Sequence, residues 1–195
     1  MNYLDTDIRY CKGIGEKKAQ LFNKLGVINV RDLVSYFPRK YEDRSSFKPI
    51  ALTCDGETVC INALAAEDAR LVRIRRGLEL VKFRVVDESG SVDITFFNQP
   101  YIKNNIHRGD SLNIYGKIIG VGGKRTMTNP VIEREGTVGG VTGRIVPVYR
   151  LTTGLSQKLV MSAVRQALDA SAADLPEVLP ESLRRKYRLA QTGYA

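Results

Sequence analysis

The middle of the chain alternates between apolar and polar positions in five short runs, a pattern typical of β-strands that bury one face. In order, the runs are ETVCINALAAE (57–67), LVKFRVVD (80–87), SVDITFF (91–97), DSLNIYGKII (110–119) and KRTMTNPVIE (124–133). A short helix that opens at Pro100, with Asn98 as its expected cap, separates the third run from the fourth. Five strands with a helix between the third and fourth predict an OB-fold, a small Greek-key β-barrel.

Helical periodicity appears on both sides of this β-rich stretch. KKAQLFNKLGV and VRDLVSYF carry apolar residues at helical spacing, and a longer pattern of this kind follows Ser156, its expected N-cap. A last helix is expected in PESLRRKYRL, with Pro180 in its first turn. The sequence thus predicts an α+β protein in four segments: helical residues 1–50, the OB-fold over 51–135, a glycine-rich connector over 136–155 and a helical linker over 156–195.

Two adjacent phenylalanines end the third run, and they cannot both enter one core. Neighbouring side chains on a strand point to opposite faces. Val92, Ile94 and Phe96 share one face and form an apolar set suited to the barrel interior. Phe97 falls on the opposite, polar face, and we expect it to point to solvent.

Two tyrosines are expected to point outward in the same way. In the short helix, Ile102 and Ile106 form the buried stripe, which leaves Tyr101 beside that stripe. In the fourth run, Tyr115 and Lys117 fall on the outward face. Outward rings can stack on nucleobases without reading sequence. The alternative is that another segment, such as the N-terminal helices, covers them.

Charge gives a second indication of nucleic-acid binding. The net charge is +9 and the isoelectric point is about 9.6, and an excess of Lys and Arg attracts phosphate backbones or anionic lipid. Cations gather in the links between the first and second runs and between the fourth and fifth: Arg70, Arg73, Arg75, Arg76, Lys124 and Arg125. In an OB-fold these two links flank the usual nucleic-acid groove, so we expect both to contact a DNA backbone.

A glycine turn near the N-terminus gives a third indication. In CKGIGEKKAQLF, Gly13 and Gly15 precede a helix, whose first backbone N–H groups can bind a phosphate. Lys17 and Lys18 add positive charge. The turn resembles the hairpin of a helix-hairpin-helix motif, which grips the DNA backbone. A turn that only folds the domain is the alternative interpretation.

Several blocks, taken in order, resemble the N-terminal region of RecG proteins: GIGEKKAQLFNKLGV, DLVSYFPRKYEDRS, FFNQPYIKNNIHRGDSLNIYGK, RIVPVYRLTTGLSQK and LPESLRRKYRL. This family comprises bacterial ATP-dependent DNA helicases that remodel stalled replication forks and branched DNA. The resemblance covers essentially the whole chain. It implies that the OB-fold is a wedge domain placed at a branch point, where Phe97 and Tyr101 stack on the bases at which the strands part.

The resemblance also implies a wider role and setting. The full-length protein would drive fork regression and Holliday-junction branch migration in DNA repair and recombination, in the bacterial cytoplasm. Its ATP and Mg²⁺ would be bound by two RecA-like motor domains. This sequence contains no G-x-x-x-x-G-K-[ST] phosphate loop, so we interpret it as a domain of a longer protein that needs no cofactor and hydrolyses nothing. Single-strand-binding protein is a further expected partner, and a monomer is the expected state.

Other functions remain open from the sequence. A standalone OB-fold that binds RNA, single-stranded DNA or another protein is the main alternative. A DNA ligase fragment would need a K-x-D-G lysine, which is absent, and a glycosylase fragment would need an aspartate beyond the hairpin, for which the sequence offers only Asp32. Neither a signal peptide, a membrane span, a metal site nor a catalytic site is expected, and the three cysteines are expected to be reduced.

Overall fold

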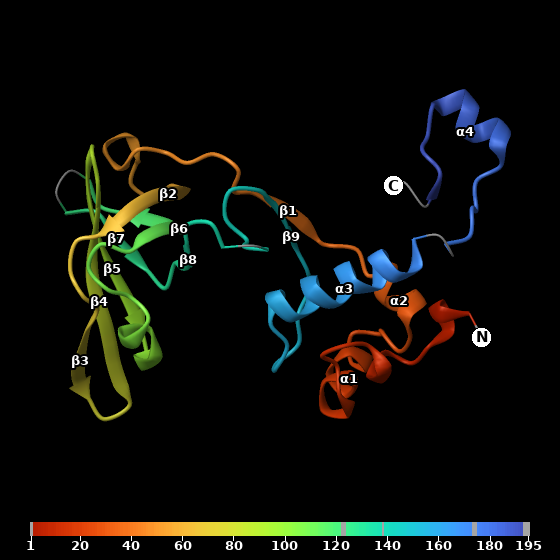
Figure 1. The fold of residues 1–195 in the computed structure, drawn as a ribbon, viewed down its shortest axis with the longest axis horizontal. Coiled ribbons are helices and arrows are strands. Elements are labelled where there is room, and N and C mark those ends of the chain that lie inside the picture. Colours follow the sequence, from red (N-terminus) through yellow and green to blue (C-terminus); the bar gives the residue numbers. More distant parts are fainter. Residues whose placement is uncertain (1, 122–123, 138, 173–174, 193–195) are drawn as a thin grey trace. The chain divides into compact units, whose positions relative to one another are not determined.

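The computed structural model describes residues 2–121, 124–137, 139–172 and 175–192 (Figure 1). The chain forms two compact units. The helical unit consists of Met1–Tyr41 and Pro147–Ala195, and the barrel unit consists of Glu42–Val146. The N-terminal and C-terminal helical segments, which the sequence suggests as separate, therefore belong to the same unit.

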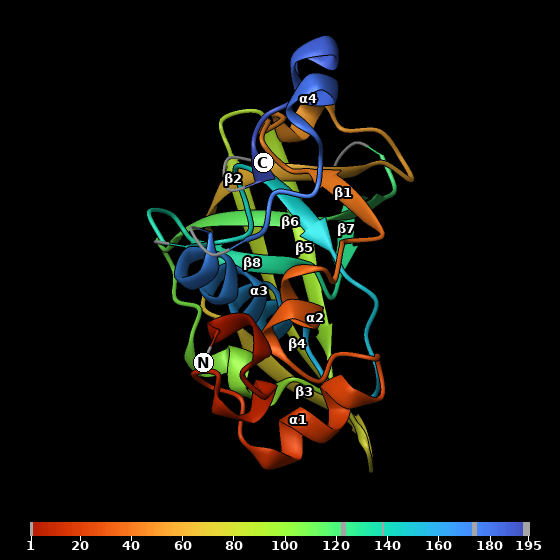
Figure 2. The same cartoon turned by 90° about the vertical axis from the view of Figure 1, so that its right-hand side faces the viewer.

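The barrel unit contains a closed five-stranded β-barrel, which confirms the predicted fold class. Its neighbouring strands, in order around the barrel, are β2 (Thr58–Ala65), β4 (Leu78–Asp87), β5 (Gly90–Phe97), β7 (Thr126–Thr128) and β6 (Ser111–Ile119). Antiparallel pairing of β2 with β6 closes the barrel, and β5 and β7 are parallel. Figure 2 shows β6 crossing the direction of β4 and β5, as closure requires.

Alternate side chains along these strands fill the barrel interior. Val92, Ile94 and Phe96 of β5 are buried as the alternation predicts. The Phe96 ring stacks on Phe83 of β4, with ring centroids 6.5 Å apart. The 3₁₀ helix η3 (Ile50–Leu52) adds buried Ile50 to the same core.

The basic link between the first two predicted strands is itself a strand. Residues Arg70–Arg75 form β3, which pairs antiparallel with the first half of β4. The sequence VRIR (72–75) alternates like the other strands, and Gly77, with a φ of 80°, makes the tight turn that a hairpin needs. Figure 1 shows β3 and β4 running together as a hairpin that projects from the barrel.

The fifth predicted strand is broken in two. Its first part is β7, and its second part, β8 (Val131–Arg134), pairs with β6 instead. The break falls at Asn129 and Pro130, because Asn129 adopts a φ of 46° and Pro130 has no N–H to continue the ladder. The sequence NP in this run was a signal for the break.

The short helix after β5 is the 3₁₀ helix η4 (Pro100–Asn104), and its N-cap is Gln99 rather than the expected Asn98. Asn98 has a left-handed φ of 53°, and its side-chain Oδ1 accepts a hydrogen bond from the N–H of Glu79 at 3.0 Å. Its side chain is therefore engaged with β4 and does not cap the helix.

The helical unit packs both ends of the chain around one core. Its elements are η1 (Tyr3–Asp5), η2 (Ile8–Tyr10), α1 (Glu16–Asn23), α2 (Val30–Val34), α3 (Gln157–Ser171) and α4 (Glu181–Tyr187). Leu4, Phe22 and Leu33 share this core with Val160 and Val164 of α3. Ser156 caps α3 as predicted, whereas Pro180 is the N-cap residue of α4 and precedes its first turn.

A separate two-stranded sheet joins β1 (Lys40–Asp43) and β9 (Ile145–Val148). None of the helices in the described ranges has the length and apolarity needed to cross a membrane.

Candidate nucleic-acid interface

Phe97 ends β5 with its ring exposed, as the alternation of the strand predicts. The residue is 41% exposed, whereas its neighbour Phe96 lies in the core. Its backbone N–H donates to Oδ1 of Asn129 at 2.9 Å, which fixes the end of the strand. Asn98 then turns the chain away, and its N–H donates to the carbonyl oxygen of Glu79 at 2.8 Å. Phe97 is therefore an outward ring on a rigid strand end.

Tyr101 follows on η4 and is 61% exposed, which agrees with its predicted position beside the buried stripe. Ile106 is buried and Ile102 packs against the barrel core, as expected, but η4 ends at Asn104, so Ile106 lies beyond the helix and the two residues do not form one helical stripe. The Tyr101 hydroxyl donates to Oε1 of Gln99 at 2.6 Å. This bond restricts the ring and leaves much of its surface accessible.

The β3–β4 hairpin brings the predicted arginines close to these aromatics. Nε of Arg73 donates to Oε1 of Glu79 at 2.9 Å, whereas the side chains of exposed Arg75 and Arg76 have no hydrogen bond or ion pair with another described residue. A shallow pocket of about 470 Å³ lies between the hairpin tip, residues 73–77 and 79, and the turn residues Asn98 and Pro100. Cations and the Phe97–Tyr101 segment therefore share one end of the barrel.

Tyr115 lies elsewhere, and its outward ring is covered. The guanidinium of Arg44 stacks 4.0 Å from the ring centroid, and Nη2 of Arg44 donates to Oε2 of Glu42 at 2.6 Å. Burial, followed by the nearby Glu42 carboxylate, raises the pKa of the Tyr115 hydroxyl. The covering residues precede the barrel strands and are not the N-terminal helices considered from the sequence. With one ring face occupied, Tyr115 offers a poorer stacking surface than Phe97.

The second predicted basic link does not join the Phe97 site. The carbonyl oxygen of Arg125 accepts a hydrogen bond from the N–H of Asp93, which lies four residues before Phe97, about 13 Å along an extended strand. The Arg125 guanidinium donates to the carbonyl oxygen of Ala51 at 2.9 Å, so it holds η3 in place. Lys124 is exposed beside it, while Gly122 and Gly123 of this link lie outside the described residues. Lys117 is exposed on β6, which β7 separates from β5.

The glycine turn belongs to the helical unit. Gly13 has a φ of 84°, Gly15 is the N-cap of α1, and a Cβ at either position would meet nothing within 4 Å. Nζ of Lys18 donates back to the carbonyl oxygen of Gly13 at 2.8 Å, and Lys17 is exposed. The element before the turn is the three-residue η2, so an α-helix flanks the turn only on its C-terminal side.

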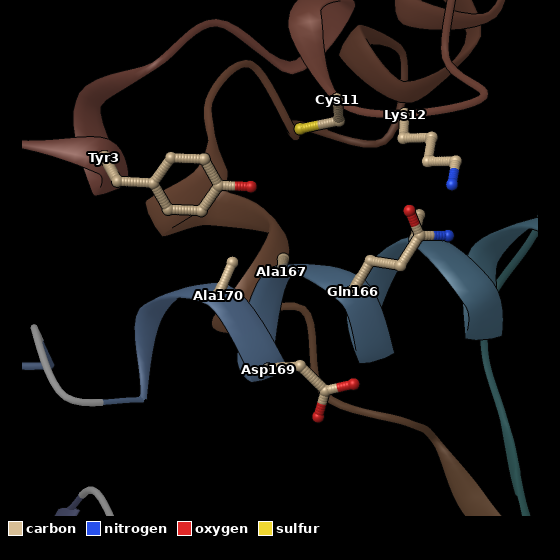
Figure 3. A pocket seen from close by; sticks show the side chains of 8 residues that line it. Tyr3, Cys11, Lys12, Gln166, Ala167, Asp169 and Ala170 are labelled. Carbon is tan, nitrogen blue, oxygen red and sulfur yellow. The ribbon is translucent and has the colours of Figure 1, made fainter.

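Cys11 and Asp32, two residues with side chains that could take part in catalysis, have structural roles or surroundings that make them unreactive. A pocket of about 400 Å³ in the helical unit is lined by Tyr3, Cys11, Lys12 and one face of α3 (Figure 3). Burial, with a contribution from Asp7, raises the pKa of the Cys11 thiol, which keeps it protonated and weakly nucleophilic. Asp32, the aspartate considered for a glycosylase, accepts hydrogen bonds from the N–H groups of Ile28 and Asn29 and completes the capping box of α2, whose N-cap is Asn29.

Within the described residues, no group of three or more His, Cys, Asp or Glu side chains is arranged to hold a metal ion. All three cysteines are free.

Three residues shape the Phe97 site in ways that sequence reasoning did not predict. Asn98 and Asn129 set the chain direction and hold β5, and asparagine tolerates positive φ better than most residues. Leu80 is 8% exposed although it belongs to neither core and lies opposite Phe97 on the outer face of β4. The NQP and NP sequences were signals for the two asparagines, whereas an outward buried leucine leaves no clear sequence signal.

Comparison with known proteins agrees with this architecture. The ATP-dependent DNA helicase RecG of Streptococcus pneumoniae is 31% identical over 187 residues, which cover 95% of this chain and 27% of that protein. RecG of Bacillus subtilis is 28% identical over 184 residues, which cover 94% of this chain and 26% of that protein. The chain thus spans about a quarter of the length of these curated relatives.

A solved structure of RecG bound to a three-way DNA junction matches 96% of this chain and 26% of its own, with a TM-score of 0.83 and 28% identity. The family model described as the RecG wedge domain matches residues 7–170, which is most of the chain. The chain therefore belongs to the RecG wedge domain family.

Proposed function

We propose that this protein binds branched DNA, such as a replication fork or Holliday junction, and parts the strands at the branch point. The observation that carries the proposal is the exposed Phe97 ring at a fixed strand end beside a basic hairpin. An aromatic ring can replace the neighbouring base in a stack, which is favourable for any base sequence. Branched DNA supplies the unpaired base that such a ring requires.

The residues divide into two roles in this proposal. Phe97 and Tyr101 stack on bases; before DNA arrives, a backbone hydrogen bond fixes the strand end that carries Phe97, and the bond to Gln99 restricts the Tyr101 ring. Arg73, Arg75 and Arg76 lie on the adjacent hairpin and attract the phosphates that flank the branch. Binding a preformed site avoids part of the cost of ordering side chains on association.

Strand separation follows from this placement. A rigid barrel held at a branch point excludes the space in which the two strands would pair again. Phe97 stabilises the open form by giving the exposed base a partner. The protein would then act as a passive wedge, and any force that moves the DNA would come from elsewhere.

The longer relatives suggest that source of force. Relatives named ATP-dependent DNA helicases are roughly three and a half times as long as this chain. We infer that this wedge serves such a helicase in the cytoplasm of a bacterium and supports fork regression and branch migration in repair and recombination. ATP and Mg²⁺ would be bound outside this chain, because its sequence lacks the phosphate-binding loop. A monomeric state and single-strand-binding protein as a second partner stay predictions.

A gel-shift comparison tests the proposal. The chain is titrated against a three-way junction, a linear single strand and a blunt duplex of matched length, with and without ATP. We expect the tightest binding to the junction and no effect of ATP. Equal affinity for the junction and the blunt duplex would contradict branch recognition.

A further inference from the structure

β5 keeps hydrogen bonds along both edges up to its last residue, although the chain turns away at that point. The strand pairs with β4 as far as Phe97 and with β7 as far as Thr95. Directly beyond these pairs stand two asparagines with left-handed backbone conformations, Asn98 with a φ of 53° and Asn129 with a φ of 46°. Asparagine adopts this conformation more readily than most residues, because its short polar side chain can hydrogen-bond to nearby backbone groups. Each asparagine therefore lies where a β-ladder stops.

On the β7 edge, the side chain of Asn129 takes the place of a backbone carbonyl. Alternate residues of β5 bond to β7, and the N–H of Asp93 donates to the carbonyl oxygen of Arg125 at 2.9 Å. The N–H of Asn129 donates to the carbonyl oxygen of Thr95, also at 2.9 Å. In a regular parallel ladder, the next bond would run from the N–H of Phe97 to the backbone carbonyl of Asn129. Oδ1 of Asn129 accepts that bond instead, at 2.9 Å.

On the β4 edge, Asn98 makes the same substitution. Leu80 lies opposite Phe97, so Glu79 and Asn98 are the next pair along the ladder. In a hydrogen-bonded antiparallel pair, the N–H of each residue donates to the carbonyl oxygen of the other. The N–H of Asn98 donates to the carbonyl oxygen of Glu79 at 2.8 Å, as that pattern requires. The return bond from the N–H of Glu79 goes to Oδ1 of Asn98 at 3.0 Å, in place of its backbone carbonyl.

We propose that Asn98 and Asn129 are positioning residues for branch recognition, which act on DNA through Phe97 and make no DNA contact of their own. Because both ladders end in side-chain bonds, the backbone can turn away directly after Phe97 while the end of the strand stays fixed. The ring is thereby left exposed on an ordered backbone, and stacking a base on it costs less conformational freedom. This inference rests on the proposed branch binding and names the residues that prepare its stacking site.

Asn129→Gly isolates the side-chain bond, because glycine keeps the positive φ without strain but has no Oδ1. Fluorescence anisotropy of the whole chain would be measured on a fork and on a blunt duplex, at a temperature where melting curves show each variant to be folded. We expect the Kd for the fork to rise about 3- to 10-fold and the Kd for the duplex to stay unchanged. Asn129→Asp keeps an acceptor oxygen for the N–H of Phe97, so it should retain the ratio of fork to duplex affinity.

A double-mutant cycle separates positioning from direct contact. In a Phe97→Ala background, Asn129→Gly should cause no further loss on the fork, because the ring that it positions is gone. Asn98 also begins the turn that leads into η4, so the effect of Asn98→Gly should disappear only when Phe97 and Tyr101 are both alanine. Asn62→Ala is the matched control. It removes a side-chain bond of 2.8 Å to Asn113 in the same unit, and it should leave the fork preference unchanged.

The outcomes separate positioning from the proposed function. If Phe97→Ala lowers the fork preference but Asn129→Gly does not, or if the two losses simply add, the positioning role is wrong and stacking by Phe97 stands. If Asn129→Gly weakens fork and duplex binding equally, Asn129 supports the fold alone and the inference also fails. If Phe97→Ala leaves the fork preference unchanged, the proposed function itself is wrong.

Discussion

Replacing Phe97 by alanine should weaken binding to a fork much more than binding to a duplex. A phenylalanine buries roughly 200 Å² when fully covered, so the exposed 41% corresponds to roughly 80 Å² that a base could cover. At about 25 cal/mol per Å², this area contributes about 2 kcal/mol, within the range of about 1–3 kcal/mol measured for base–aromatic stacks. The expected loss on the fork is therefore about 30-fold in Kd.

Fluorescence anisotropy with a labelled fork and a blunt duplex of equal length would measure this effect at one salt concentration. Tyr101→Ala should give a second loss of about 1–3 kcal/mol on the fork if its ring meets another base. The double variant should lose roughly the sum of the two. Duplex affinity should change little in all three, because phosphate contacts dominate there.

Phe47 provides a matched control, since it belongs to the same unit and is also 41% exposed. Phe47→Ala should leave the ratio of fork to duplex affinity unchanged. The reasoning would be refuted if Phe97→Ala weakened both DNAs equally, or if Phe47→Ala lowered the fork preference as much as Phe97→Ala does.

Three more predictions follow from the surrounding structure. Arg75→Gln should reduce the slope of log K against log salt by about 0.9, whereas Arg125→Gln should lower the melting temperature and leave that slope unchanged, because its guanidinium holds the Ala51 carbonyl. Tyr115→Ala removes the ring under Arg44 and should lower the free energy of unfolding in urea by about 1–3 kcal/mol without changing the fork preference. Burial raises the pKa of the Asp87 carboxyl, but hydrogen bonds from Ile50, Ser89 and Gly90 outweigh it and hold this pKa below its usual value. The ionised carboxylate therefore stabilises the fold above pH about 4, and that stabilisation is lost as pH falls through the lowered pKa. Asp87→Asn should cost about 1–3 kcal/mol of unfolding free energy at pH 7 and flatten its decline in acid, and equal acid profiles would contradict this role.

Alternation along the strands was enough to predict the barrel and the outward direction of Phe97. A shift of the strand by one residue would have placed Phe97 in the core and Phe96 in solvent. Val92 and Ile94 exclude this shift, because they are apolar and share a face with Phe96. Tyr101 was equally accessible to sequence reasoning, because helical spacing points it away from its neighbour Ile102, although Ile106 lies beyond the end of η4.

The arrangement of cations could not be read in the same way. A run rich in arginine appears as a loop when charge is weighed alone, yet Val72 and Ile74 within it support a strand and turn the link into a hairpin. Arg125 was expected to contact DNA, but its guanidinium donates a hydrogen bond to a backbone carbonyl oxygen of the same protein. The sequence around Arg125 does not reveal this partner, Ala51, which lies far away along the chain. The Arg44 cover over Tyr115 depends on a contact between residues 71 positions apart, which a local pattern does not encode.

Stacking of Phe97 on an unpaired base can be observed directly with a fork that carries 2-aminopurine at the first unpaired position. Binding of the unaltered chain, and of Phe47→Ala, should change the fluorescence of this base as it stacks on the ring, whereas Phe97→Ala at saturating concentration should leave it as in the free fork. An equal fluorescence change with Phe97→Ala would contradict a stacking role for this residue.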